Sequence, residues 1–186
     1  FIPNVNYEIF DDPVKFNDFD FGSYSRLANK YPSRQILFLN SHSYPICEKW
    51  LLKLSNYSTN TTLIGTSASY ESILDSIKLK KIYKVLSFFF KKMYFRKRFK
   101  SFPNPHIRTS SFLIYGQKLV DFMINKKINK KEDTWEIESG LNSLTNFFKK
   151  NNYKIFVINS DGAKFSENDW KLSETFNYRN QSKVII

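Results

Sequence analysis

The chain has 186 residues, 41% hydrophobic and 25% charged, a composition that excludes wholesale disorder and suits one α/β domain rather than two. Its 29 Lys and Arg outnumber its 17 Asp and Glu, which gives a formal net charge of +12. Its apolar runs are far shorter than the roughly 20 residues that span a bilayer, and the single cysteine, Cys47, excludes an internal disulfide. We therefore expect a cytoplasmic, reducing location. Because the chain begins with Phe1, we also expect it to be a piece of a longer protein.

The first elements are expected before residue 60. An acidic and aromatic segment over 1–24 predicts short extended pieces and turns, and residues 23–31 predict a helix that Pro32 ends. Residues 35–40 form an almost continuous apolar run, which is typical of a strand buried on both faces. A second helix is predicted over 48–56, where apolar residues recur at helical intervals.

The middle of the chain holds most of the excess charge. Residues 61–69 predict a strand broken by Gly65, and residues 76–100 then contain ten basic residues and no acid. Ile82, Leu86, Phe89 and Met93 recur at helical spacing there, which predicts a basic amphipathic helix inserted into the domain at about 76–100.

The remaining elements alternate between strands and helices. Residues 106–114 and 153–158 predict strands, residues 117–125 predict a helix, and residues 132–150 predict one long helix or two short ones interrupted near Gly140. Because strands alternate with helices and the strand runs are uniformly apolar, we expect an α/β fold with a mostly parallel sheet flanked by helices in three layers.

Four clusters could carry chemistry, and each has a structural alternative. Residues 40–43 could contact a phosphate, sugar or metal, or could form a capping turn. His106 and Arg108 are expected on one side of a strand, where Arg108 could bind a phosphate or carboxylate or could pair with a nearby acid. The acidic residues over 132–138 could include a general base with a raised pKa, or could be the favoured acidic start of a helix. The segment 170–182 could close over a ligand or be an irregular terminus.

The order of these clusters carries a resemblance. The motifs, in chain order, are FLNSHS, LIGTSASYES, FPNPHIRTSSFLI, KEDTWEIESGLNSLT and W-x-x-S-x-TF-x-x-x-x-QS. This set, which covers about residues 20–182, resembles bacterial glycosyltransferase-like proteins related to the inverting family 2 enzymes with a GT-A fold. The resemblance implies transfer of a sugar from a nucleotide-sugar donor to a saccharide or lipid-linked acceptor, in the synthesis of surface polysaccharide or lipopolysaccharide. It also implies that the first βα unit of the GT-A domain is missing before Phe1.

The resemblance implies roles for particular residues. The general base would be one of three carboxylates, Asp133, Glu138 or Glu132. The remaining residues, which would contact the substrates, are Arg26, Asn40, Ser41, His42, His106, Arg108, Arg179 and Gln181. The family holds Mn²⁺ or Mg²⁺ with an Asp-x-Asp motif at the end of a strand. Asn40-Ser41-His42 stands at that place without either aspartate, so His42 would be the possible metal ligand.

Other readings of the chain stay open. A non-catalytic sugar-binding or scaffold domain would also explain the missing aspartates. The segment 78–100 could lie on the anionic inner face of the membrane, beside a lipid-linked acceptor, or could be an ordinary insertion whose aromatic residues pack on the sheet. A nucleic-acid-binding module is disfavoured, because the charge lies in one segment and lysine predominates over arginine.

Overall fold

The computed structural model describes residues 8–12, 18–79, 81–175 and 181–186. The helices are α1 (Phe19–Lys30), α2 (Trp50–Ser55), α3 (Ile73–Ser76), η1 (Ile82–Lys84), α4 (Val85–Arg96), α5 (Gly116–Met123), α6 (Lys131–Ser139), α7 (Leu144–Lys150) and η2 (Glu167–Ser173), of which η1 and η2 are 3-10 helices. The strands are β1 (Gln35–Leu39), β2 (Thr62–Gly65), β3 (Ala68–Ser69), β4 (His106–Ile107), β5 (Ser111–Tyr115), β6 (Lys154–Ile158) and β7 (Lys164–Phe165).

Most predicted elements are present, and most have shorter bounds. The first helix is longer than predicted, because α1 already begins at Phe19, within the segment expected to hold only extended pieces and turns. The acidic helix is two helices, because α6 ends at Gly140 and Ser143 caps the start of α7 by accepting a hydrogen bond from the backbone N–H of Asn146. The predicted strand over 61–69 is divided into β2 and β3, and the one over 106–114 into β4 and β5. β3 pairs with β4 in a separate two-stranded sheet.

The main sheet has the strand order β1-β5-β2-β6-β7 and is mostly antiparallel, so the prediction of a mostly parallel sheet is wrong. β2 and β6 are parallel, whereas the pairs β1–β5, β2–β5 and β6–β7 are antiparallel. A continuous apolar run reports burial on both faces of a strand, and it carries no information about the direction of the neighbouring strand.

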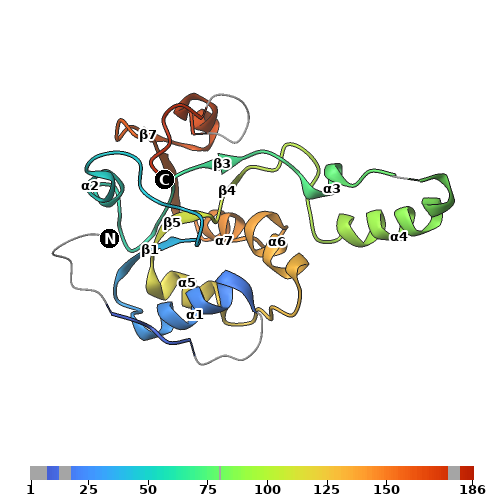
Figure 1. The fold of residues 1–186 in the computed structure, drawn as a ribbon, viewed down its shortest axis with the longest axis horizontal. Helices are drawn as coiled ribbons and strands as arrows, with labels where there is room; N and C mark the ends of the chain where they lie inside the picture. The colour runs from blue at the N-terminus through green and yellow to red at the C-terminus, as the bar shows by residue number, and fades with distance from the viewer. Residues whose placement is uncertain (1–7, 13–17, 80, 176–180) are drawn as a thin grey trace.

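Both faces of the main sheet are covered. Leu63, Phe112 and Val157 point to the face packed by α1, α5 and α7, where the larger core lies. The residues that follow or precede them along each strand, among them Ile64 and Leu113, face the opposite way and pack against α2 and Ile185 near the C-terminus. This alternation gives an α/β protein with packed elements on both sides of the sheet (Figure 1).

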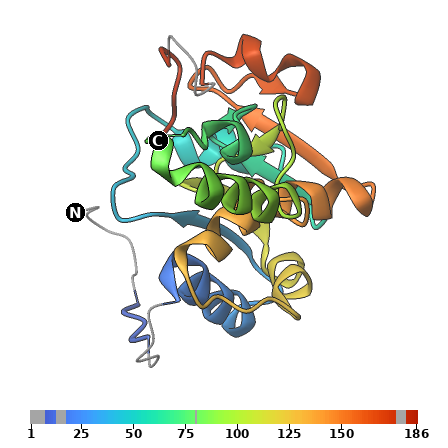
Figure 2. The ribbon, with the colours of Figure 1, turned by 90° about the vertical axis from the view of Figure 1, so that its right-hand side faces the viewer.

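The basic segment projects from this body. We call residues 73–100 the arm: it comprises α3, η1 and α4, follows β3, and returns to β4. Figure 1 shows α4 at the end of the molecule farthest from α2, and Figure 2, turned by 90°, shows α4 in front of the sheet. A small cluster of Leu74, Phe95 and Phe99 holds the arm together, and Trp135 of α6 packs against it. Among the described residues, no helix combines the length and the apolar content needed to cross a bilayer.

Candidate functional site

Polar residues gather at one edge of the main sheet. Asn40 follows β1 directly, and its backbone N–H donates to the carbonyl oxygen of Ser110, just before β5, over 3.0 Å. Because β1 and β5 are antiparallel, the end of one strand meets the start of the other. The N–H of Arg108 likewise donates to the carbonyl of Ser67, beyond the end of β2, over 3.1 Å. The end of β1 and the segment before β5 therefore form one polar edge of the sheet.

The segment 104–109 is fixed against α6 and α7 by side chains. The Asn104 amide donates to the carbonyl of Ser139 over 2.7 Å, and the hydroxyl of Thr145 accepts from the N–H of Ile107 over 2.9 Å. Beside them, the Thr109 hydroxyl donates to Oε2 of Glu138 over 2.7 Å. These bonds set the last turn of α6, with Glu138, next to β4.

Two cavities meet at this place. The larger, of about 640 Å³, is bordered by His106, Arg108, Glu138 and Trp135, with residues of the loop into α3 on its other side. The smaller, of about 270 Å³, lies towards α1. The residues that border it are Phe19, Asp20, Phe21, Tyr24, Asn40, Arg108, Thr109, Ser110, Lys131, Thr134 and Glu138. Arg108 and Glu138 border both cavities, so one cation and one carboxylate stand where the two spaces adjoin.

His106 lies beside that carboxylate as a neutral base. Only 6% of its surface is exposed, and its Nδ1 lies 2.7 Å from the carbonyl oxygen of Asn104. Burial lowers the pKa of His106 below its ordinary value of 6.5, against the raising effects of that carbonyl and of Glu138. With the proton on Nδ1 donated to the carbonyl, Nε2 is left as an acceptor, 4.0 Å from Oε1 of Glu138.

The three predicted carboxylates have different surroundings. Asp133 lies in the first turn of α6, where it accepts from the backbone N–H groups of Asn129 and Lys130 and pairs with Arg98 over 2.7 Å. Burial raises the pKa of Asp133, but these hydrogen bonds and the guanidinium together hold it below its usual value. Glu132, also in the first turn, borders neither cavity. Asp133 thus stabilises the start of helix α6, which was the structural alternative for this acidic segment. Glu138 is the predicted carboxylate that borders the cavities.

Tyr24 on α1 brings an unused polar group to the smaller cavity. Burial raises the pKa of Tyr24 strongly, and its hydroxyl oxygen is buried with no hydrogen-bond partner among the described residues. Buried polar groups in folded proteins are nearly always hydrogen-bonded, so this hydroxyl could accept or donate a bond to a bound molecule.

Several predicted site residues lie elsewhere. Arg26 pairs with Asp12 and Asp18, so two carboxylates already neutralise its charge. Ser41 and His42 are exposed and border neither cavity, and Gln181 is exposed near the C-terminus. Arg179 lies outside the described residues.

The turn after β1 does not fit the metal site that the resemblance implies. The Oδ1 atom of Asn40 accepts from the N–H of His42 and from the Ser43 hydroxyl, as a capping turn would have it. Within the described ranges, no three His, Cys, Asp or Glu side chains group as a metal ion needs.

Sequence reasoning missed five polar or charged residues that border the smaller cavity: Asp20, Tyr24, Ser110, Lys131 and Thr134. It also did not single out Thr109, although this residue stands within the motif around His106 and Arg108. Asp20 and Tyr24 lie on α1, about a hundred residues from α6 along the chain, and no pattern in the sequence signals that these two helices border one cavity.

Comparison of the chain with protein-family models, curated proteins and solved structures found no match. The arrangement of these side chains and the ordered motifs therefore carry the functional argument.

Proposed function

We propose that this chain is a glycosyltransferase-like protein that moves a sugar from a nucleotide-sugar donor to a saccharide or lipid-linked acceptor in surface polysaccharide synthesis. One observation carries the proposal: two cavities meet at Glu138 and Arg108. A transferase must bind two substrates so that their reacting atoms touch, and a base and a cation are needed at that point. The relation to GT-A enzymes is part of the proposal and rests on the ordered motifs, since the mostly antiparallel sheet lends it no support.

The charges suggest which substrate each cavity takes. Arg108 and Lys131 border the smaller cavity, and a planar guanidinium suits the paired oxygens of a diphosphate. The unpartnered hydroxyl of Tyr24 is a further contact for a polar donor. The larger cavity has Trp135 and Phe102 at its border, whose rings suit the apolar faces of an acceptor sugar.

The reaction then requires one proton transfer and one displacement. The Glu138 carboxylate takes the proton from the acceptor hydroxyl, whose oxygen forms a bond to the anomeric carbon while the bond from that carbon to the donor phosphate oxygen breaks. Negative charge grows on the leaving diphosphate, where Arg108 and Lys131 stabilise it. The reaction would take place on the cytoplasmic side of the membrane, where nucleotide-sugar donors are available.

The position of Glu138 supports a functional role. Acidic side chains stabilise the first turn of a helix, where Glu132 and Asp133 lie, but oppose the macrodipole in the last turn, where Glu138 lies. A carboxylate in an unfavourable position next to a buried histidine and two cavities is better explained by function than by stability.

A second candidate is a sugar-binding domain of the same shape without catalysis. The engagement of Asn40 Oδ1 in a turn favours it, because the equivalent position in the family binds metal and diphosphate. Binding of a nucleotide sugar without turnover would support this candidate against the transferase.

The test combines binding with turnover. We expect purified protein to be stabilised thermally by at least one nucleotide sugar in a panel run with and without Mg²⁺ and Mn²⁺. With that donor, Glu138→Gln should lower the rate by about 100-fold or more while the donor still binds, because general bases contribute factors of this order. The exposed control Asp121→Asn should keep the parent rate.

A third variant isolates the smaller cavity. Tyr24→Phe should leave the free energy of unfolding unchanged or higher, because the lost hydroxyl has no partner in the described fold, yet should weaken donor binding by about tenfold. Absence of any donor response would contradict both candidates, and equal rates for the parent and Glu138→Gln would contradict the transferase.

A further inference from the structure

One face of α4 is apolar and uncovered. Ile82, Leu86, Phe89, Phe90 and Met93 form what we call the apolar stripe, and each is between 45% and 86% exposed. Apart from the adjacent Phe89 and Phe90, successive members are three or four residues apart, which places them on one side of α4 and of the turn η1 before it. Large apolar side chains that gather on a projecting helix mark an interaction site, since soluble surfaces seldom expose contiguous apolar patches.

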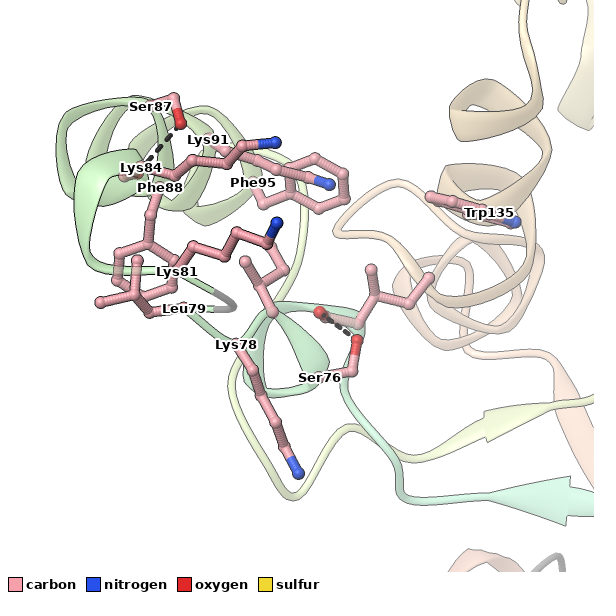
Figure 3. A pocket seen from close by; sticks show the side chains of 12 residues that line it. Ser76, Lys78, Leu79, Lys81, Lys84, Ser87, Phe88, Lys91, Phe95 and Trp135 are labelled. Atoms are coloured by element: carbon pink, nitrogen blue, oxygen red, sulfur yellow. Dashed lines mark hydrogen bonds between the residues drawn. The ribbon is translucent and has the colours of Figure 1, made fainter.

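The opposite side of α4 faces α3 and the body of the protein. Phe88, Lys84, Lys91 and Phe95 face a cavity of about 700 Å³ between α3 and α4, with Trp135 across it, as Figure 3 shows. Leu86 and Phe88 differ by two residues, or about 200° around a helix, so the stripe points away from this cavity. The arm therefore packs against the body through one side of α4 and presents the apolar stripe outward.

The charge around the stripe has one sign. Residues 76–100 contain ten basic residues and no acid. Arg98 pairs with Asp133 and Glu136, whereas in the described part of the arm no other cation forms an ion pair with an acid. Lys91 and Lys92 lie over the rings of Phe95 and Phe88 instead. The surface beside the stripe is consequently positively charged, and acidic side chains do not neutralise it.

We propose that the arm docks on an anionic lipid bilayer, with the apolar stripe at the boundary between headgroups and acyl chains and the surrounding Lys and Arg on the phosphates. Apolar residues on one face and cations at its margins are what an interfacial helix needs. The inference does not depend on sugar transfer, because neither the apolar stripe nor any Lys or Arg of the arm borders either cavity of the proposed active site.

Other occupants fit less well. A second copy of the chain seated on the same face would bring two uncompensated cationic arms together, and like charges repel. Single-stranded nucleic acid is bound by aromatic stacking, but Ile82, Leu86 and Met93 of the stripe have no aromatic ring on which a base could stack. A bilayer accepts both the aliphatic groups and the charge.

The experiment measures partition of the full chain into vesicles. We expect binding to vesicles of phosphatidylglycerol and phosphatidylcholine at low salt, and little binding to pure phosphatidylcholine. Removing three charges with Lys92→Gln, Arg96→Gln and Lys97→Gln should lower the partition coefficient by about 100-fold, at about fivefold per cation. Its matched control, Arg34→Gln with Lys127→Gln and Lys154→Gln, removes three exposed cations elsewhere and should bind as the parent does.

A second pair of variants tests insertion. Leu86→Ser with Phe89→Ser and Met93→Ser should lower binding by about tenfold or more, because these side chains would no longer enter the boundary. All three positions are exposed, so the fold should persist, and circular dichroism checks that it does. The control changes the exposed Leu51, Leu52 and Leu172 to Ser, and should bind as the parent does.

A probe in the stripe gives a direct reading. In the variant Phe89→Trp, the emission of the added indole should shift to the blue on anionic vesicles and be quenched by brominated acyl chains. Equal binding to neutral and anionic vesicles, no effect of either triple variant, or a probe that brominated lipid does not quench would each overturn the proposal. Two further results would overturn the proposal. One is sedimentation of the parent chain as a dimer that dissociates in the Leu86→Ser, Phe89→Ser, Met93→Ser variant, and the other is tighter binding to single-stranded RNA than to the vesicles.

Discussion

His106 lies next to Glu138 in almost complete burial. Its Nδ1 proton is held by a backbone carbonyl, which leaves Nε2 free to accept a hydrogen bond, 4.0 Å from the Glu138 carboxylate. The Thr109 hydroxyl donates to the other carboxylate oxygen and keeps the Glu138 side chain in place. Three side chains from β4, the loop after it and the end of α6 therefore set the geometry in which a proton would move.

The lowered pKa of His106 makes a stability prediction. The folded state binds a proton on this ring less readily than the unfolded state, so below the unfolded pKa of 6.5 the unfolded chain gains protons first. We expect the free energy of unfolding to fall as pH drops from about 6.5 towards 5, by at most about 1.4 kcal/mol per pH unit from this residue. Urea denaturation across this range measures the slope.

Two variants test whether His106 causes this dependence of the free energy of unfolding on pH. His106→Gln should flatten it, while His42→Gln, which removes an exposed imidazole, should leave it as in the parent. A slope that persists in full in His106→Gln would mean that other groups cause it.

At the scale of elements, the approach of α5 to the end of α1 depends on a residue without a side chain. Gly116 begins α5, and a Cβ atom there would lie 2.5 Å from the carbonyl oxygen of Tyr31 and 3.2 Å from the Cα of Pro32. The Gly116 N–H also donates to the carbonyl of Arg34 over 2.8 Å. Pro32, which ends α1, thus lies directly against the start of α5, and the two helices cover the same face of the sheet.

We predict that Gly116→Ala destabilises the protein by about 1–3 kcal/mol, because backbone atoms cannot move aside as a flexible side chain can. The helix preference of alanine acts in the opposite direction, by about 1 kcal/mol at most. Urea denaturation checks the loss, and Gln117→Ala, one residue on and exposed, should stay within about 0.5 kcal/mol of the parent. Equal stability of Gly116→Ala and the parent would show that α5 lies farther from α1.

For the whole molecule, the arm and the body have separate cores. Leu74, Phe95 and Phe99 form a cluster apart from the two clusters that flank the sheet, and the Phe95 and Phe99 rings stack with centroids 5.4 Å apart. α4 has 12 residues, about the length at which an isolated helix is marginal in water, so its stability depends on this cluster. We therefore expect that the arm can open while the sheet stays folded.

Phe95→Ala should therefore act locally. Removing a buried phenylalanine costs about 3–5 kcal/mol, and here we expect that cost as faster hydrogen exchange of the amides in α4, with those of β2 and β5 protected as in the parent. Phe148→Ala, in the main core, should instead lower the protection of the sheet. Loss of protection in the sheet of Phe95→Ala would contradict two separate cores.

Local sequence patterns are sufficient to predict the secondary structure of much of the chain. The apolar runs before Asn40 and after Asn152 are strands because several consecutive apolar residues must be buried on both faces, and helix α1 ends before Pro32 because proline disfavours helix in the residue before it. The sequence also placed a basic amphipathic helix within residues 76–100 and polar residues after β1. These features depend on neighbours in the chain, so local patterns are sufficient to find them.

Three features depend on contacts between distant parts of the chain: the direction of the strands, which carboxylate lies at the cavities, and which face of α4 stays exposed. Strand direction depends on how β1, β5 and β2 pair, which a run of apolar residues does not encode. Asp133 and Glu138 are both carboxylates in the same acidic segment of the sequence. In the structure, Arg98 neutralises Asp133, whereas Glu138 borders the two cavities. α4 has apolar residues on two sides, Phe88 and Phe95 on one and the apolar stripe on the other, and packing against α3 and Trp135 selects the side that is covered. Contacts between distant parts of the chain make each of these choices, because they depend on which surfaces fit together in three dimensions.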